Sequence, residues 1–202
     1  VETSVNVLLA FDEGDQTMVD AGMAVVAEEC ADATRLDDAL VETWLGHRNE
    51  VSALEALISK GYVVDTMEIS APWGALDQIY EDGLAAIAGV AGTLAVSAHQ
   101  SHSYPAGGCL YFTFAAQVAP EERDAYYAAA WDAGTRAVLA GGGSLSHHHG
   151  VGLNRARFVA EALGEGLGVL AQVKAALDPH GICNPGKLGL PDPFGAVRWP
   201  TA

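Results

Sequence analysis

The sequence predicts an α+β fold: a mostly antiparallel sheet covered by helices, with a C-terminal arm that is first helical and then extended. Short runs rich in β-branched and aromatic residues alternate with longer stretches in which apolar residues recur at helical spacing. Two predicted strands, at 93–99 and 109–118, follow one another directly, which favours antiparallel pairing. Beyond residue 150 come two helical stretches and a tail with five prolines.

The N-terminal part is predicted to hold a strand and two helical stretches. The apolar run from Val5 to Phe11 predicts a buried strand. A helix is expected over 17–30 and helical structure over 37–60, broken near Gly46, with Gly61 as a natural stop. The run 62–69 predicts the next strand.

A helix with one apolar face is expected after this strand. Ser70 is expected to cap it, with Pro72 in its first turn. Its predicted apolar face consists of Trp73, Leu76, Tyr80, Leu84 and Ile87. A loop at 101–108 joins the next two strands, and a helix opening at Pro120 should end at the glycines 141–143. Its predicted inward residues are Tyr127, Trp131, Gly134 and Val138.

The C-terminal part differs in character from the rest of the chain. Helices are predicted over 154–163 and 167–177, followed by the proline-rich tail. We therefore predict one α+β domain over residues 1–150 and an arm over 151–202 that packs on a neighbouring surface.

Composition excludes several classes of partner. The net charge of −16 in 202 residues argues against nucleic acid or an anionic membrane. The most membrane-like stretch, 83–98, is shorter than the roughly 20 apolar residues that a spanning helix needs, so we expect no transmembrane segment. Cys30, Cys109 and Cys183 are widely spaced and form no Cys-x-x-Cys pair, which favours a reducing cytoplasm.

The most informative motif is Gly-Gly-Gly-Ser-Leu-Ser-His-His-His-Gly-Val-Gly at 141–152. In extended backbone, His147 and His149 would share one side and His148 would point to the other, so one metal could not take all three. Two could ligate zinc, but no cysteine or acidic pair nearby in the sequence completes such a site. We therefore expect no metal there, and favour anion binding or proton transfer over a solvent-exposed polyhistidine loop.

Two further residues are candidates for a site. Tyr104 lies beside His102 and shortly before two glycines, so its phenol could act as a base near the imidazoles, or could simply pack. Arg48 follows a glycine-broken helical stretch, and its fork could hold a carboxylate or phosphate. A surface salt bridge is the alternative for Arg48.

Four motifs, in order, resemble a known family. Ser-His-His-His-Gly-Val-Gly at 146–152 and Leu-Asp-Pro-His-Gly-Ile-Cys-Asn-Pro-Gly-Lys-Leu at 177–188 resemble the C-terminal part of FAD-linked oxidases of the vanillyl-alcohol-oxidase type. The triple histidine looks like the alkylglycerone-phosphate synthase branch. The segments Glu-Ile-Ser-Ala-Pro-Trp at 68–73 and Tyr-Pro-Ala-Gly-Gly-Cys-Leu-Tyr-Phe at 104–112 agree, so the resemblance covers nearly the whole chain.

The resemblance implies a ferredoxin-like cap domain that forms the substrate side of an active site. The FAD would be held mainly by an N-terminal domain outside this sequence, on which the arm would pack, and a homodimer is possible. By position, Tyr104 matches the active-site tyrosine of the family, and His147, His148 and His149 match its histidine triplet. Arg48 would grip the substrate anion.

Asn184 matches an asparagine that the family brings near the flavin. Its context, Asn-Pro-Gly-Lys, is the bacterial oxidase form and not the one usual in animal synthases. The resemblance thus implies an FAD-dependent oxidation of a small 2-hydroxy acid or alcohol at flavin N5. The alternatives are alkylglycerone-phosphate synthesis and, from another class, a non-catalytic module that binds metal through its histidines.

Overall fold

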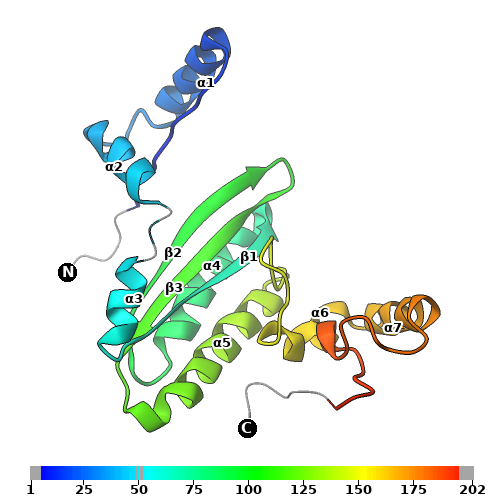
Figure 1. Ribbon diagram of the computed structural model, residues 1–202. Helices are drawn as coiled ribbons and strands as arrows, with labels where there is room; N and C mark the ends of the chain where they lie inside the picture. The colour runs from blue at the N-terminus through cyan, green and yellow to red at the C-terminus, as the bar shows by residue number, and fades with distance from the viewer. Residues whose placement is uncertain (1–5, 49, 51, 196–202) are drawn as a thin grey trace. The chain divides into compact units, whose positions relative to one another are not determined.

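A computed structural model describes residues 6–48, 50 and 52–195. The chain divides into two compact units, residues 1–53 and 54–202. Figure 1 labels the helices and strands of both units.

The first unit contains two helices, α1 (Gln16–Glu29) and α2 (Ala39–His47). The α1 helix starts where predicted, because the Asp15 carboxylate accepts hydrogen bonds from the backbone N–H groups of the first turn. The predicted strand at 5–11 is wrong for residues 6–11, which are irregular and largely exposed; residue 5 lies outside the described residues. An apolar run becomes a strand only where a partner takes up its N–H and C=O groups. No described residue pairs with it.

The helical stretch predicted over 37–60 is interrupted, but later than expected. Helix α2 passes Gly46 and ends at His47, and α3 (Ser52–Ser59) follows after the break. Gly61 ends this stretch as predicted, with a φ of +89° that only glycine adopts easily.

The second unit is built on a three-stranded sheet. Strands β1 (Val63–Pro72), β2 (Thr93–Tyr104) and β3 (Gly107–Ala116) lie in the order β1-β3-β2, and both pairs are antiparallel. The predicted α+β fold class is confirmed. The strands are longer than predicted, so the expected loop at 101–108 shrinks to Pro105 and Ala106 (Figure 1).

The start of the next helix differs from the prediction. Helix α4 (Trp73–Ala88) begins directly after β1, so Ser70 belongs to the strand and does not cap the helix, and Pro72 stands at the N-cap. Pairing with β3 extends to Pro72 opposite Gly107, and this overrides the capping signal. A Cβ atom at Gly107 would lie 2.1 Å from the carbonyl oxygen of Ala71, so only glycine permits this approach.

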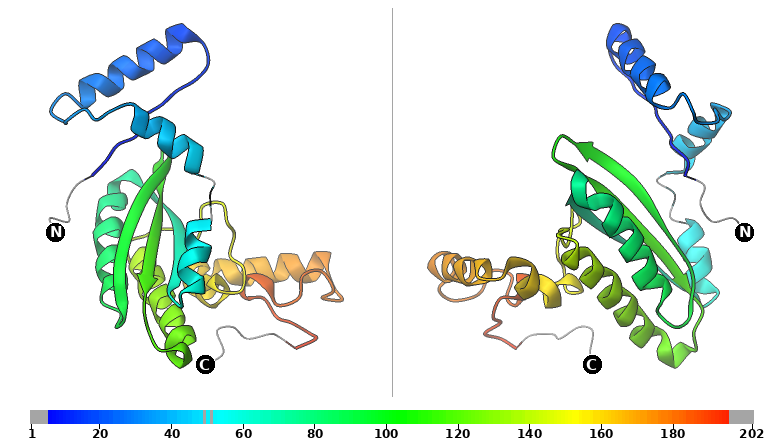
Figure 2. Two further views of the ribbon diagram at one scale, coloured as in Figure 1. Left: turned by 60° about the vertical axis from the view of Figure 1, so that its left-hand side comes forward. Right: turned by 180° about the vertical axis from the view of Figure 1, so that it is seen from behind.

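Helices α4 and α5 (Arg123–Ala140) cover one face of the sheet (Figure 2). The α5 helix follows a 3₁₀ turn at Pro120–Glu122 and ends at Gly141, as predicted. On β1 and β3, every second side chain points into the core between the sheet and the helices. These residues are Met67, Ile69, Ala71, Leu110, Phe112, Phe114 and Ala116. The predicted inward positions Leu76, Ile87, Trp131, Gly134 and Val138 are buried. Trp73 is 43% exposed, and its predicted inward position is wrong.

The arm folds as predicted, to within a few residues. It contains a 3₁₀ turn (Arg155–Phe158), α6 (Val159–Leu163), α7 (Gly166–Leu177) and a last 3₁₀ turn (Lys187–Gly189). Phe158 and Val159 pack with Leu145 in a second small core, whereas much of α7 is exposed. The division at residue 150 stays a prediction. Among the described helices, none combines the length and apolar character needed to cross a bilayer.

Candidate active site

The face of the sheet that α4 and α5 leave open carries the polar groups. Because side chains alternate along a strand, residues next to the core positions point to the other face. The register sets Glu68 of β1 opposite Tyr111 of β3, and Tyr111 opposite His99 of β2. The next residues of this face, Ser70 and Cys109, form another pair. This arrangement places a carboxylate, a phenol, an imidazole and a thiol on one surface.

Residues 144–150, which we call the histidine loop, are attached to this surface by β1. The backbone N–H of Ser144 donates to the carbonyl of Ser70 at 2.8 Å. The backbone N–H groups of His147 and His149 both donate to the carboxylate of Glu68, the second at 2.8 Å. One acidic side chain thereby fixes the backbone on both sides of His148.

Glu68 is fully buried, and its negative charge is compensated. Burial acts to raise the pKa of Glu68, but hydrogen bonds from the Ser146 hydroxyl and from the two loop N–H groups, together with the charge of Arg155, lower this pKa overall. The carboxylate therefore stays ionised near neutral pH and keeps accepting these hydrogen bonds.

Arg155 is the buried cation that compensates Glu68. Its guanidinium lies 3.7 Å from the Glu68 carboxylate, donates to the carbonyl of Gly150 at 2.8 Å, and lies 5.0 Å from the ring centre of Trp131. It thus connects the arm, the histidine loop, β1 and α5. Arg155 therefore has an internal, structural role.

The imidazoles of the loop meet two tyrosines from the sheet. Tyr104 Oη is 3.0 Å from His147 Nε2, Tyr111 Oη is 3.3 Å from His148 Nε2, and the Nδ1 atoms of His147 and His148 are 2.7 Å apart. The rings of His148 and His149 are 4.3 Å apart. The alternation expected for extended backbone is wrong, because the loop bends at each histidine and neighbouring rings stay in contact.

His102 joins this group through an irregularity in β2. The strand shifts register between Ser101 and Ser103, and His102 adopts a φ of +54°, which brings its ring to 5.1 Å from His147 and 5.3 Å from His148. Burial, followed by the neighbouring imidazoles, lowers the pKa of His102 and so favours its neutral form. Together with the two tyrosines and the three loop histidines it forms what we call the histidine–tyrosine cluster.

Tyr111 lies in the middle of the cluster, on the central strand. Its ring lies 5.9 Å from that of His149 and 6.1 Å from that of His99, between ring centres. Burial, the Cys109 sulfur and the Glu68 charge raise the pKa of Tyr111, so this phenol is neutral at physiological pH.

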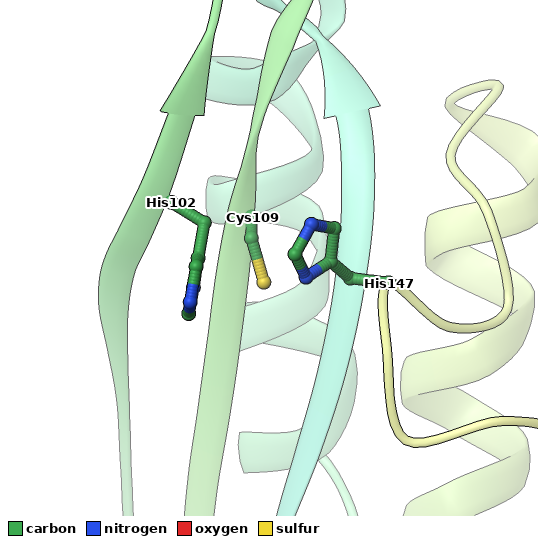
Figure 3. Close-up of side chains that lie close together, drawn as sticks. All are labelled: His102, Cys109 and His147. Carbon is green, nitrogen blue, oxygen red and sulfur yellow. The ribbon is translucent and has the colours of Figure 1, made fainter.

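Among the residues that the structure describes, two groups of side chains could hold a metal ion: His102 with Cys109 and His147, and Glu68 with His148 and His149. In each group the candidate ligand atoms lie within 4.8 Å of one another, and Figure 3 shows the first group pointing together from β2, β3 and the loop. Cysteine and carboxylate partners are therefore present in space, although none is near in sequence. Burial, with the charge of Glu68, raises the pKa of Cys109 to about 11, so this thiol is protonated in the absence of a metal.

A cavity of about 770 Å³ adjoins one side of the cluster. Tyr104 and His147 line it together with the hairpin glycines and the arm. The larger apolar side chains of its wall are Leu145, Val151, Val159, Leu163, Leu170 and Leu188. A ligand in this cavity would have an apolar wall and a phenol–imidazole pair at its edge.

The two remaining candidates do not belong to the cluster described above. Arg48 lies in the first unit, where its guanidinium is 5.6 Å from the ring centre of Trp44. Asn184 is exposed, with a φ of +49°, in a turn held by the Asp178 carboxylate, which accepts the backbone N–H groups of Ile182 and Cys183. The roles of Arg48 and Asn184 stay predictions.

Sequence reasoning gave no role to Glu68 and Tyr111, and named His102 only as a neighbour of Tyr104. A signal existed for Glu68, because an acidic residue at the centre of an apolar strand needs a buried partner. The remaining residues could be assigned to the site only once the strand register was known, because the register decides which side chains lie opposite one another.

Comparison with known proteins defines the class. The family described as FAD linked oxidases, C-terminal domain, matches residues 2–188. The chain therefore belongs to this family of FAD-linked enzymes.

The relatives carry two different names. Over 108 residues, 53% of this chain and 18% of the relative, the chain is 38% identical to the alkyldihydroxyacetonephosphate synthase of Trypanosoma brucei brucei. Over 198 residues, 90% of this chain and 41% of the relative, it is 30% identical to the uncharacterized FAD-linked oxidoreductase YgcU of Escherichia coli O157:H7. The chain thus spans less than half the length of either relative.

A solved structure of alkyldihydroxyacetonephosphate synthase shares the fold. It matches with a TM-score of 0.55 and 24% identity, over 85% of this chain and 30% of that one.

Proposed function

We propose that this chain forms the substrate side of the active site in an FAD-dependent oxidoreductase that oxidises a small 2-hydroxy acid or alcohol. The observation that carries the proposal is the contact of 3.0 Å between Tyr104 and His147 at the edge of the cavity. Oxidation of a hydroxyl requires a group that takes up its proton, and a phenol hydrogen-bonded to an imidazole can do so.

The residues of the open face suit an anionic or hydroxylated substrate. The exposed ring of His149 can donate a hydrogen bond to a carboxylate or phosphate. Arg48 stays the predicted clamp for a substrate anion. Tyr104 orients the hydroxyl and accepts its proton. The apolar cavity wall lies on one side of the phenol.

The same face would suit an adjoining flavin, because α4 and α5 do not cover it and because it carries hydrogen-bonding imidazoles and phenols rather than a second core. A bound flavin would supply the hydride acceptor. Asn184 is the residue of this chain that we propose to lie near it, with the N-terminal FAD-binding domain of the whole protein holding most of the cofactor.

The test is anaerobic flavin reduction in the full-length protein with a panel of 2-hydroxy acids and aromatic alcohols. A substrate that bleaches the flavin would define the reaction. Tyr104→Phe should then slow reduction by about 10²- to 10⁴-fold with the flavin still bound, whereas Tyr62→Phe, outside the cluster, should not. An unchanged rate in Tyr104→Phe would refute its assignment as the base.

A second candidate function is alkylglycerone-phosphate synthesis, in which a fatty alkoxide replaces the acyl group of acyl-dihydroxyacetone phosphate. The apolar cavity wall supports this candidate, because a long alkyl chain needs an apolar surface to bind. The similarity to the alkyldihydroxyacetonephosphate synthase of Trypanosoma brucei brucei supports it as well. Release of fatty acid from the acyl phosphate without net flavin reduction would establish this reaction instead.

The third candidate, a non-catalytic metal-binding module, is supported by the two ligand groups of the open face. Its test is the metal content of protein purified without a nickel column. One ion per chain would favour this function and count against the flavin reaction.

A further inference from the structure

Four side chains of the cluster form an unbroken hydrogen-bonded line. It runs from Tyr104 Oη to His147 Nε2 (3.0 Å), from His147 Nδ1 to His148 Nδ1 (2.7 Å), and from His148 Nε2 to Tyr111 Oη (3.3 Å). Each imidazole uses both of its nitrogens, one toward the other imidazole and one toward a phenol. The line begins at the cavity and ends on the central strand.

The chemistry of these groups makes the line directional. A neutral imidazole has one N–H donor and one acceptor nitrogen, and a hydroxyl both donates and accepts. The four groups can therefore all donate toward Tyr111, or all donate toward Tyr104. Passage of one proton converts the first arrangement into the second.

We propose that Tyr104, His147, His148 and Tyr111 are a proton relay that carries the substrate's hydroxyl proton from the cavity to the far side of the cluster. This inference rests on the proposed function, because it needs a proton delivered at Tyr104.

The transfer balances without any change in electrons. Tyr104 takes the substrate proton and gives its own to Nε2 of His147, whose Nδ1 proton moves to Nδ1 of His148. The Nε2 proton of His148 moves to the oxygen of Tyr111, and the former hydroxyl proton of Tyr111 goes to water. One proton enters and one leaves, and passage in the reverse direction restores the starting arrangement.

The surrounding structure keeps the line in place. Glu68 accepts the backbone N–H groups of His147 and His149, so the loop that carries both relay imidazoles is fixed to β1. Tyr111 lies on the central strand, paired on both sides. A metal bound by the group that contains Cys109 would take a ring nitrogen of His147, so the relay and that metal site exclude one another.

The first test looks for the line itself in the full-length flavoenzyme with ¹⁵N-labelled histidine. An N–H···N hydrogen bond transmits scalar coupling between its two nitrogens. We expect a coupling between the Nδ1 atoms of His147 and His148 that disappears in His148→Ala. Absence of this coupling in the wild-type protein would overturn the relay whatever the substrate is.

The second test is kinetic. With a substrate that reduces the flavin, a plot of rate against the fraction of D₂O should be curved in the wild type, because several protons move together, and linear in Tyr111→Phe. Tyr111→Phe and His148→Ala should slow reduction at least tenfold, with imidazole rescuing the second, while His180→Ala, in the exposed tail, should not.

The outcomes separate the relay from the reaction. Full rates in Tyr111→Phe and His148→Ala, with Tyr104→Phe inactive, would overturn the relay and leave Tyr104 as a base that acts alone. Failure of every hydroxylated substrate to reduce the flavin would overturn the proposed function, and the nitrogen coupling would still decide whether the line exists.

Discussion

Glu68 shows how much one side chain can organise. It is a buried acid within an otherwise apolar strand, it accepts the N–H groups of the histidine loop, and it faces the buried guanidinium of Arg155. It does not line the cavity beside Tyr104, so we regard it as a positioning residue for the cluster.

Replacing this carboxylate should be costly. Glu68→Gln keeps the size of the side chain but removes the largest compensating charge of the buried Arg155, so we expect a loss of about 3 kcal/mol in the free energy of unfolding. Urea unfolding would measure it. The control, Glu81→Gln on the exposed side of α4, should stay within about 0.5 kcal/mol of wild type. A loss below about 1 kcal/mol in the first variant would contradict the assigned role.

The lowered pKa of Glu68 predicts that the folding stability depends on pH. Because the pKa of Glu68 is lower in the folded chain than in the unfolded one, its contribution to stability is complete above the ordinary glutamate pKa of about 4.3 and is lost as the pH falls through the lower, folded pKa. The stability difference between wild type and Glu68→Gln should therefore be largest near pH 7 and shrink below about pH 4. A difference that stays constant over this range would refute the explanation.

At the scale of elements, the sheet and helix α4 fit closely at a glycine. A Cβ atom at Gly83 would lie 2.6 Å from the Phe112 ring, which is itself fully buried and has no room to move. Gly74, in the first turn of the same helix, has open space where its Cβ would be.

The two glycines should therefore respond oppositely to alanine. Gly83→Ala should overpack the core and cost about 1–3 kcal/mol. Gly74→Ala should gain up to about 1 kcal/mol, because alanine favours the helix over glycine. Thermal or urea unfolding of the pair gives the comparison directly. Equal effects would mean that helix propensity, and not the contact with Phe112, controls this helix.

At the scale of the molecule, the described core belongs to the second unit. Every buried hydrophobic residue lies between Met67 and Val159, and the last of them come from the arm. Phe158 is 1% exposed beside Leu145, at the start of the histidine loop. The arm is thus part of what holds the loop.

This arrangement predicts the result of two truncations. Residues 52–202 should unfold cooperatively without the first unit. Residues 52–150 lose Phe158 and Arg155; since deleting a buried phenylalanine side chain alone costs about 3–5 kcal/mol, their midpoint should fall by about 10 °C or more. Circular dichroism on heating would show this difference. Equal midpoints would instead support an autonomous domain that ends at residue 150.

The sequence by itself determined the fold class, the family and four residues of the cluster, Tyr104 and the three loop histidines. The run at 62–69 located β1, and apolar residues at helical spacing located α4 and α5, because each helix buries one regular face. The unusual strings around Tyr104 and the three histidines marked the site. Glycines marked the ends of helices correctly at Gly61 and Gly141.

Only the tertiary structure decided what depends on pairing between distant segments. The run 6–11 is irregular because no described residue pairs with it, and Ser70 is in a strand because β3 lies opposite. The same register brings Glu68, Tyr111 and the histidine loop together over a long separation in sequence. The local sequence pattern predicts whether a side chain points into the core or away from it. The hydrogen-bonded register of the strands decides which other side chains it contacts on that face.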